Sequence, residues 1–316
     1  MPCYNYGRYL PECLGSICNQ DGEQDFEVIA IDDGSSDDTA QVLASCADAR
    51  LQVITHPKNL GHVATVNEGV NVARGEFIAR IDPDDRYRSY FLSTALAIFD
   101  ECPEVGLVYG DAAIIDDRGR VTAERSDRIH GGRDFKGSEF LRVLEDNCIC
   151  APTAIARREL WRQALPVPDG LAFNDWYFNV MMARHCEFYY VSRVLADYRV
   201  HAENHHARVI REKTEEPSIF YVLDRVFRET ECSSGLEDAK RRARRRICGR
   251  HYLTLADKYF GMGMNGDARR CYWAALRNRP SYALNAGVQR RLAATIFGRE
   301  RYELGKTLVK SALTRS

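Results

Sequence analysis

A mainly apolar segment that runs directly into three carboxylates places the strongest constraint on the fold of this chain. Residues 77–81 have the pattern of a short buried strand, and Asp82, Asp84 and Asp85 follow at once. Like charges this close raise one another's pKa or bind a cation. Asp82 and Asp84 alternate along an extended backbone and so point the same way. Because Mg²⁺ and Mn²⁺ prefer carboxylate oxygens, the pattern predicts a metal site for a diphosphate, with a solvated acidic turn as the open alternative.

Composition indicates a globular protein without a global charge bias. The chain has 316 residues, of which 45% are hydrophobic, enough for one large α/β domain and a smaller one. The 44 basic and 45 acidic residues give a formal net charge of -1, so nothing favours nucleic acid as a partner. No apolar run is long enough to span a bilayer, no signal peptide precedes Tyr4, and the 11 cysteines include no CxxC pair. We therefore expect a cytoplasmic protein with free thiols.

Strand and helix patterns alternate along the first hundred residues. Buried-strand patterns at 26–31, 51–55 and 77–81 are separated by helical spacing at 40–46 and 63–73. The alternation predicts an α/β fold with a doubly wound, mostly parallel sheet. Ligands bind such sheets at the carboxyl ends of the strands. The acidic clusters at 32–38 and 82–85 both follow strands, so we expect them to face one crevice.

The sequence changes character after about residue 211. Residues 252–280 alternate small and large side chains as a helical hairpin does, which resembles one tetratricopeptide-like helix pair. Six of the seven residues from Lys240 to Arg246 are basic. This run is expected either to contact anionic lipid or to be a solvated helix face paired with Glu237 and Asp238. We therefore expect one domain at 1–210 and a helical region at 211–316.

Six motifs taken together resemble the family 2 glycosyltransferases of GT-A fold. They are Pro2-Cys3-Tyr4-Asn5, Asp32 to Thr39, Asn59-Leu60-Gly61, Asp82-Pro83-Asp84-Asp85, Asn174-Asp175-Trp176 and Tyr198-Arg199-Val200-His201. The resemblance covers residues 1 to about 210. It implies an inverting transfer of a sugar from a nucleotide-diphosphate donor, with a UDP-sugar favoured, to a glycan or lipid-linked acceptor. Because such acceptors are common in the family, it also makes contact with the inner face of the plasma membrane plausible.

The resemblance also implies roles on the nucleotide side. Pro2 and Tyr4 fall in the turn that meets the nucleotide, with Tyr4 matching an aromatic that stacks on the base. Asp33, or its neighbour Asp32, matches the acid that hydrogen-bonds the base, and Asp82 lies close to the ribose and diphosphate. From the residues alone, Tyr4 could equally be a packed aromatic, and the two aspartates an N-cap cluster.

On the reaction side, the resemblance makes Asp84 the ligand of Mn²⁺ or Mg²⁺ and Asp175 the general base. His201 matches a further metal or diphosphate contact. Asp175 could instead be a helix-start residue favoured by the macrodipole. His201, His205 and His206 could also form a solvated loop, which the residues favour over a zinc site.

Two departures from the family pattern stand out. Asn174 occupies the place of an acidic residue that family members usually carry before the base. The apolar strand that usually precedes the Pro-x-Tyr-Asn turn is missing, so we expect the natural chain to be longer. A non-catalytic scaffold, built from a degenerate transferase domain and a partner-binding helical hairpin, is the alternative function.

Overall fold

The chain divides into two compact units. Unit 1 contains residues 1–143 and 147–204, and unit 2 contains residues 144–146 and 205–316. The computed structural model describes residues 1–22, 25–125, 129–201, 209 and 211–298.

Unit 1 begins with a parallel three-stranded sheet in the order β1-β2-β3. Its strands are β1 (Pro2–Cys3), β2 (Val28–Asp32) and β3 (Leu51–Thr55), and the helices around it are α1 (Leu10–Cys18), α2 (Thr39–Ser45) and α3 (His62–Val72). Alternation of apolar strands and helices predicts this part correctly. β1 lies at the position before Tyr4 where the sequence pattern gave no strand, and the Met1 amino group donates to the Ile29 carbonyl at 2.8 Å.

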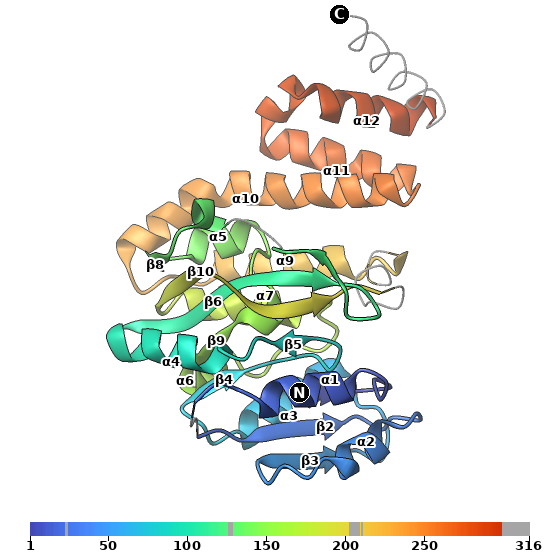
Figure 1. Cartoon of the computed structure of the whole chain (residues 1–316). Coiled ribbons are helices and arrows are strands. Elements are labelled where there is room, and N and C mark those ends of the chain that lie inside the picture. Colours follow the sequence, from blue (N-terminus) through green and yellow to red (C-terminus); the bar gives the residue numbers. More distant parts are fainter. Residues whose placement is uncertain (23–24, 126–128, 202–208, 210, 299–316) are drawn as a thin grey trace, which may run out of the picture. The chain divides into compact units, whose positions relative to one another are not determined.

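The second sheet of unit 1 is mixed and is built around two long parallel strands. Its order is β4 (Phe77–Ala79), β9 (Ile155–Arg157), β6 (Val105–Ile115), β10 (Glu187–Arg199), β5 (Arg86–Tyr87), with β7 (Val121–Ala123) on β6 and β8 (Phe135–Gly137) on β10. Among the described strands of this sheet, only β6 and β10 pair in parallel, and they run side by side through the unit (Figure 1). The strand before the carboxylates, β4, pairs antiparallel with β9.

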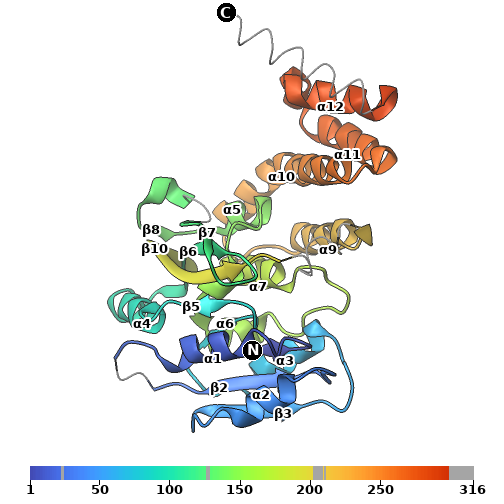
Figure 2. The ribbon, with the colours of Figure 1, turned by 45° about the vertical axis from the view of Figure 1, so that its right-hand side comes forward.

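Helices pack on this sheet through apolar stripes. They are α4 (Phe91–Glu101), α5 (Phe140–Glu145), α6 (Arg158–Gln163) and α7 (Asn174–Ala183), with short 3-10 helices at Ile129–Gly132 and Ala151–Thr153. The buried residues of α4 are Phe91, Ala95 and Phe99, spaced by four, and this face lies against β6 and β10 (Figure 2). Together with Val108 and Leu195 they belong to one hydrophobic core cluster of unit 1.

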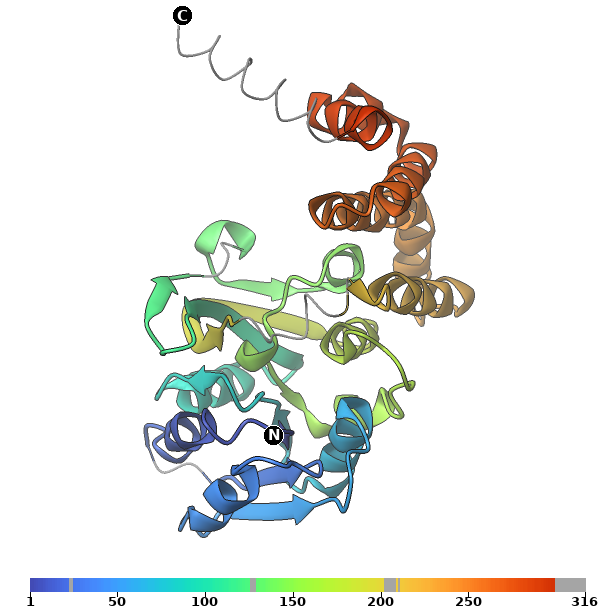
Figure 3. The ribbon, with the colours of Figure 1, turned by 90° about the vertical axis from the view of Figure 1, so that its right-hand side faces the viewer.

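Unit 2 is helical in its described part. It contains α9 (Glu215–Arg228), α10 (Ser234–Gly261), α11 (Asn265–Asn278) and α12 (Ala286–Phe297), with a 3-10 helix at Pro280–Leu284. The predicted helical hairpin corresponds to α10 and α11, and α12 packs on the other side of α11 (Figure 3). Gly263 has φ +76° in the hairpin turn, a conformation that favours glycine. None of the helices in the described residues combines the length and apolar character needed to cross a bilayer.

The expectation that Lys240 belongs to an exposed basic face is wrong. Its side chain is 1% exposed and lies 2.8 Å from Glu231 and 2.8 Å from Glu237. The helix places Lys240 on the same buried side as Ala243 and Ile247, and the two carboxylates offset its charge. The arginines at 241, 242 and 244–246 are exposed, so the basic face is narrower than the run of charges indicates.

Candidate active site

The turn between β4 and β5 holds the three carboxylates. The Asp85 amide donates to the Asp82 carbonyl at 3.1 Å, which closes the turn. Asp84 and Asp85 are buried, whereas the Asp82 side chain is 33% exposed. β5 then pairs antiparallel with β10, so the turn is held between two strands of the mixed sheet.

His201 reaches this turn from the end of β10. Its Nε2 lies 3.1 Å from Asp84 Oδ2, and its ring centroid lies 5.3 Å from that of Tyr9. The His201 side chain is 6% exposed. Two residues that the sequence placed at one metal site are therefore in contact.

Arg199 fixes the geometry of the turn from inside the fold. Its side chain is 1% exposed, and Nε donates to the Asp84 carbonyl at 2.7 Å. Its backbone amide donates to Asp85 Oδ1 at 2.9 Å, and Nη2 donates to Glu12 Oε2 at 2.7 Å. In the sequence, Arg199 is only one residue of a motif. In the structure it hydrogen-bonds both Asp84 and Asp85.

The electrostatics of the turn favour binding of a cation. Burial raises the pKa of Asp84, the charge of Asp82 raises it further, and the hydrogen bond from His201 opposes both. Burial, followed by the charges of Asp84 and Asp82, raises the pKa of Asp85 well above its usual range. A positive charge at this place would relieve the repulsion between the carboxylates.

The donor set fits a divalent cation that arrives with a diphosphate. Asp84 offers a carboxylate oxygen and His201 an imidazole nitrogen at one point. Mg²⁺ commonly takes one or two protein ligands and completes its shell with phosphate and water, and Mn²⁺ accepts similar oxygen ligands. In the described residues, no group of three or more His, Cys, Asp or Glu is arranged to hold a metal. His205 and His206, considered above for zinc, lie outside the described residues.

Asp33 connects β2 to the loop after β3. It accepts hydrogen bonds from the amides of Leu60 at 2.7 Å and Gly61 at 2.9 Å, and His56 Nδ1 lies 2.7 Å from the same carboxylate. Burial opposes the charge of Asp33, but these hydrogen bonds outweigh it and hold the pKa below its usual range. The hydrogen bond to Asp33 raises the pKa of His56 despite burial, and Glu68 adds to this effect.

The β2 end approaches the 58–61 loop closely. Gly34 has φ +72°, and a Cβ there would lie 2.6 Å from the Lys58 carbonyl carbon, so only glycine fits without a backbone shift. Asp32 accepts the Ser35 amide at 3.0 Å, which shapes the turn. Asp32 therefore has a local structural role, whereas Asp33 connects the end of β2 to the segment after β3.

The segment after β1 lies beside these residues. Pro2 is buried opposite Ile31 in the parallel pairing, and the Asp33 amide donates to the Cys3 carbonyl at 2.8 Å. Tyr4 follows and is 45% exposed, which leaves its ring accessible to a ligand. Asn5 has φ +59°, and its Oδ1 accepts the Ser36 amide at 2.8 Å, which fastens this turn to the β2 end.

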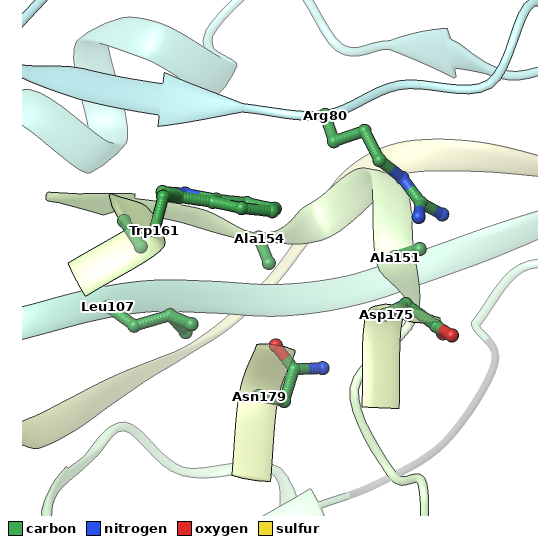
Figure 4. Close-up of a pocket in the computed structure, with 8 residues that line it drawn as sticks. Arg80, Leu107, Ala151, Ala154, Trp161, Asp175 and Asn179 are labelled. Atoms are coloured by element: carbon green, nitrogen blue, oxygen red, sulfur yellow. The ribbon is translucent and has the colours of Figure 1, made fainter. Parts of the chain in front are cut away.

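Asp175 lies in the first turn of α7. Its Oδ2 accepts a hydrogen bond from Asn147 Nδ2 at 3.1 Å. It lines a pocket with Arg80, Trp161 and Asn179, and the guanidinium of Arg80 points toward the side of the pocket where Asp175 stands (Figure 4). Arg80 Nη2 lies 3.3 Å from Asp82 Oδ2, so one cation connects the carboxylate turn to the surroundings of Asp175.

The structure thus gathers the sequence-predicted residues into two groups. Tyr4, Asp32 and Asp33 lie at the ends of β1 and β2, whereas Asp82, Asp84 and His201 lie at the β4–β5 turn. Asp175 joins the second group through the pocket that it shares with Arg80.

Sequence reasoning missed two residues of the site, Arg80 and His56. A cation inside an apolar strand pattern was the available signal for Arg80. For His56 the signal was a polar residue directly after a strand.

Comparison with known sequences identifies a family and relatives that match more than half of the chain. A family model described as "Glycosyl transferase family 2" matches residues 1–163. An uncharacterized glycosyltransferase of Nostoc sp. is 26% identical over 211 residues, covering 64% of this chain and 64% of that protein. An uncharacterized protein of Mycobacterium tuberculosis is 32% identical over 187 residues, covering 56% of each chain. The chain thus spans less than two thirds of the length of these relatives.

Solved structures resemble the fold over nearly the whole chain. Residues 1–349 of TarS from Staphylococcus aureus, in complex with UDP-GlcNAc, match with a TM-score of 0.68 at 18% identity, over 96% of this chain and 90% of that one. The mannosyltransferase PcManGT from Pyrobaculum calidifontis, in complex with GDP-Man and Mn²⁺, matches with a TM-score of 0.59 at 17% identity, over 93% and 82%. At these identities the likeness shows the fold alone, and it confirms the predicted GT-A-like α/β class with its C-terminal helices.

Proposed function

This chain belongs to glycosyl transferase family 2, and from that premise we propose that it is a metal-dependent, inverting glycosyltransferase. It moves a sugar from a nucleotide-diphosphate donor, a UDP-sugar in the first instance, to a hydroxyl group of a glycan or lipid-linked acceptor. The observation that carries the proposal is the contact of 3.1 Å between His201 and Asp84 in the turn after β4. This contact places an imidazole nitrogen beside a carboxylate oxygen. A cation bound there would relieve the repulsion between the carboxylates of the turn.

The nucleotide side of the site is assigned to the β1 and β2 ends. The accessible ring of Tyr4 is suited to stack on a base, and Pro2, in strand β1, anchors the segment before it to β2. A carboxylate offers about four lone-pair sites, so Asp33, with three donors in place, keeps room for a base N–H. Asp32 supports the turn, and Asp82 faces the ribose and diphosphate. TarS and PcManGT, solved with UDP-GlcNAc and GDP-Man, support a nucleotide sugar as donor.

The transfer itself needs a base and a stabilised leaving group. Asp175 takes the proton from the acceptor hydroxyl, whose oxygen attacks the anomeric carbon on the face opposite the diphosphate. The bond between that carbon and the diphosphate oxygen breaks, and the configuration inverts. A divalent cation held by Asp84 and His201 would offset the negative charge of the departing diphosphate.

Unit 2 carries charge suited to an anionic membrane surface. Its residues include 24 Lys and Arg against 14 Asp and Glu, a formal net charge of +10, whereas unit 1 has 20 against 31, or -11. Arg242 and Arg245 on α10 are exposed and have no ion-pair partner among the described residues. Each such charge near anionic lipid contributes about 1 kcal/mol. We therefore propose peripheral contact with the anionic inner leaflet of the plasma membrane through this face of α10.

A donor screen tests the proposed function. Purified protein is mixed with UDP-sugars and GDP-sugars, Mn²⁺, and simple glycan acceptors, and release of the nucleotide diphosphate is measured. We expect release with at least one donor, lost on chelation of the metal, and NMR of the product should show inverted anomeric configuration. Retention of configuration, or no release from any donor, would contradict the proposal.

A further inference from the structure

Arg80 makes two separate contacts from the end of β4. Its Nη1 donates to Asn174 Oδ1 at 2.5 Å, and its Nη2 lies 3.3 Å from Asp82 Oδ2. Its side chain is only 11% exposed. Asn174 is the first residue of α7, directly before the proposed base Asp175. One guanidinium therefore bridges the carboxylate turn and the helix that carries the base.

The charge of Arg80 is matched to its surroundings. Burial alone would favour the neutral form, but the negative charges of Asp82, Asp175 and Asp85 outweigh it and raise the pKa of Arg80. A planar guanidinium can hold two oxygen atoms in fixed directions, which a lysine ammonium on a flexible stem cannot. The geometry of the contact therefore adds to its charge.

Asn174 is poorly explained by packing. Arg80 fixes the orientation of the Asn174 amide, because only its oxygen can accept the guanidinium N–H. The amide nitrogen is then buried without a hydrogen-bond partner among the described residues. A buried donor without a partner costs about 1–3 kcal/mol. A carboxylate at position 174 would have no such donor, but its negative charge would offset the positive charge of Arg80.

We propose that Arg80 is a positioning residue of the transfer reaction, which sets the separation between the diphosphate side at Asp82 and the base at Asp175. Asn174 serves as a neutral acceptor that fixes the guanidinium. The positive charge of Arg80 therefore remains available to interact with Asp82 and Asp175. The inference rests on the proposed function, because it assigns Arg80 to the same site.

Two variants of Arg80 separate the effect of the guanidinium geometry on the rate from the effect of its positive charge. Arg80→Lys keeps the charge but cannot hold both oxygens, and Arg80→Gln removes the charge. A displacement of about 1 Å at a reacting centre can lower the rate on the order of 10²-fold. We expect both variants to lower kcat to this order, while the KM for the donor changes far less. If Arg80→Lys retained the wild-type kcat, charge alone would matter and the proposal would be wrong.

A double-mutant cycle tests whether Arg80 acts through Asn174. The cycle compares kcat of Arg80→Lys, Asn174→Ala and the double variant. Residues that act through one contact are not additive, so the double variant should be no slower than the slower single variant. Losses that multiply would show that the two residues act independently and would overturn the proposal.

Arg157→Gln is the matched control for a structural effect. Arg157 also fastens β4, through Phe77 in the sheet pairing and Glu76 at 2.9 Å, but its hydrogen bonds in the described part of the chain go to Glu76, Val105 and Pro103 and not to Asp82 or α7. It should lower the urea midpoint and leave kcat unchanged. If Arg157→Gln lowered kcat as much as Arg80→Lys, the role of Arg80 would be structural only.

Failure of the proposed function can be told from failure of this inference. If the wild-type protein turned over no donor, the proposed function itself would be wrong. If the wild type were active and Arg80→Lys equally active, only the role of Arg80 would be wrong.

Discussion

His201 Nε2 lies 3.1 Å from Asp84 Oδ2, although 117 positions separate the two residues in the chain. The pairing of β10 brings them together, because β10 pairs with β5 directly after the carboxylate turn. The same strand delivers Arg199, which holds the backbone of Asp84. The sheet order thus assembles the candidate metal site, and neither segment could form it alone.

Asp84→Asn should abolish metal-dependent turnover and leave the fold intact. The amide keeps the shape of the side chain but removes the charge that attracts a cation. Turnover is measured over a Mn²⁺ titration, and circular dichroism and the urea midpoint report the fold. Arg157→Gln again serves as an active control. A near-normal rate for Asp84→Asn at ordinary Mn²⁺ concentration would show that another residue binds the metal.

Asp175→Asn should lower kcat on the order of 10²-fold or more, as loss of a general base does. Donor binding should change little, because the pocket that Asp175 lines with Arg80 includes neither Tyr4 nor Asp33. Steady-state kinetics give kcat, and titration calorimetry gives the donor affinity. An equal loss of donor affinity would make Asp175 a binding residue.

The pair of His56 and Asp33 should give a pH-dependent contribution to stability. The pKa of His56 is raised above 6.5 in the folded state, so its contribution is complete below that pH and is lost as pH rises through the folded pKa. The pKa of Asp33 is lowered below 3.8, so its contribution is lost only in acid. The difference in urea midpoint between wild type and His56→Gln should therefore be largest between pH 5 and 6 and shrink toward pH 8.5. A difference that grows over this range would mean that His56 is buried in the neutral form.

Arg242→Glu combined with Arg245→Glu should weaken binding to anionic vesicles. Each arginine is expected to contribute about 1 kcal/mol near such a surface, and reversal of charge adds repulsion. Flotation with vesicles of phosphatidylcholine, with or without phosphatidylserine, measures the binding. Arg269→Glu with Arg277→Glu, two exposed arginines on α11, is the matched control and should retain binding. Equal flotation of the wild type with neutral and anionic vesicles would end the membrane proposal.

Local patterns predicted the parallel part of the fold well. Residues 51–55 form β3 as predicted, because their apolar run lies between clear turn and helix signals. The short strands β5 and β8 were missed, since two or three residues carry little pattern and are set by their pairing with β10. Lys240 was assigned to the wrong side of its helix, because Glu231, nine positions earlier, provides the partner that allows its burial.

From the sequence, single residues of the candidate site could be proposed, but their arrangement could not. Motifs pointed to Asp84 and His201, yet their contact depends on the register of β10. The partner of Arg80 is 94 positions away, and His56 meets Asp33 across 23 positions, so a local signal can mark each residue as unusual but cannot identify its partner. Reasoning from sequence thus finds side chains with unusual chemistry, and long-range pairing decides which of them act together.

Thermal unfolding with nucleotide sugars, with and without Mn²⁺, tests the central claim most directly. A ligand at 100 times its dissociation constant should add about 2.7 kcal/mol to the stability of the folded protein. We predict that at least one nucleotide sugar raises the Tm of the wild type only when Mn²⁺ is present, and that Asp84→Asn loses this shift. No shift with any donor, as a non-catalytic scaffold would give, or an equal shift in Asp84→Asn, would contradict the account.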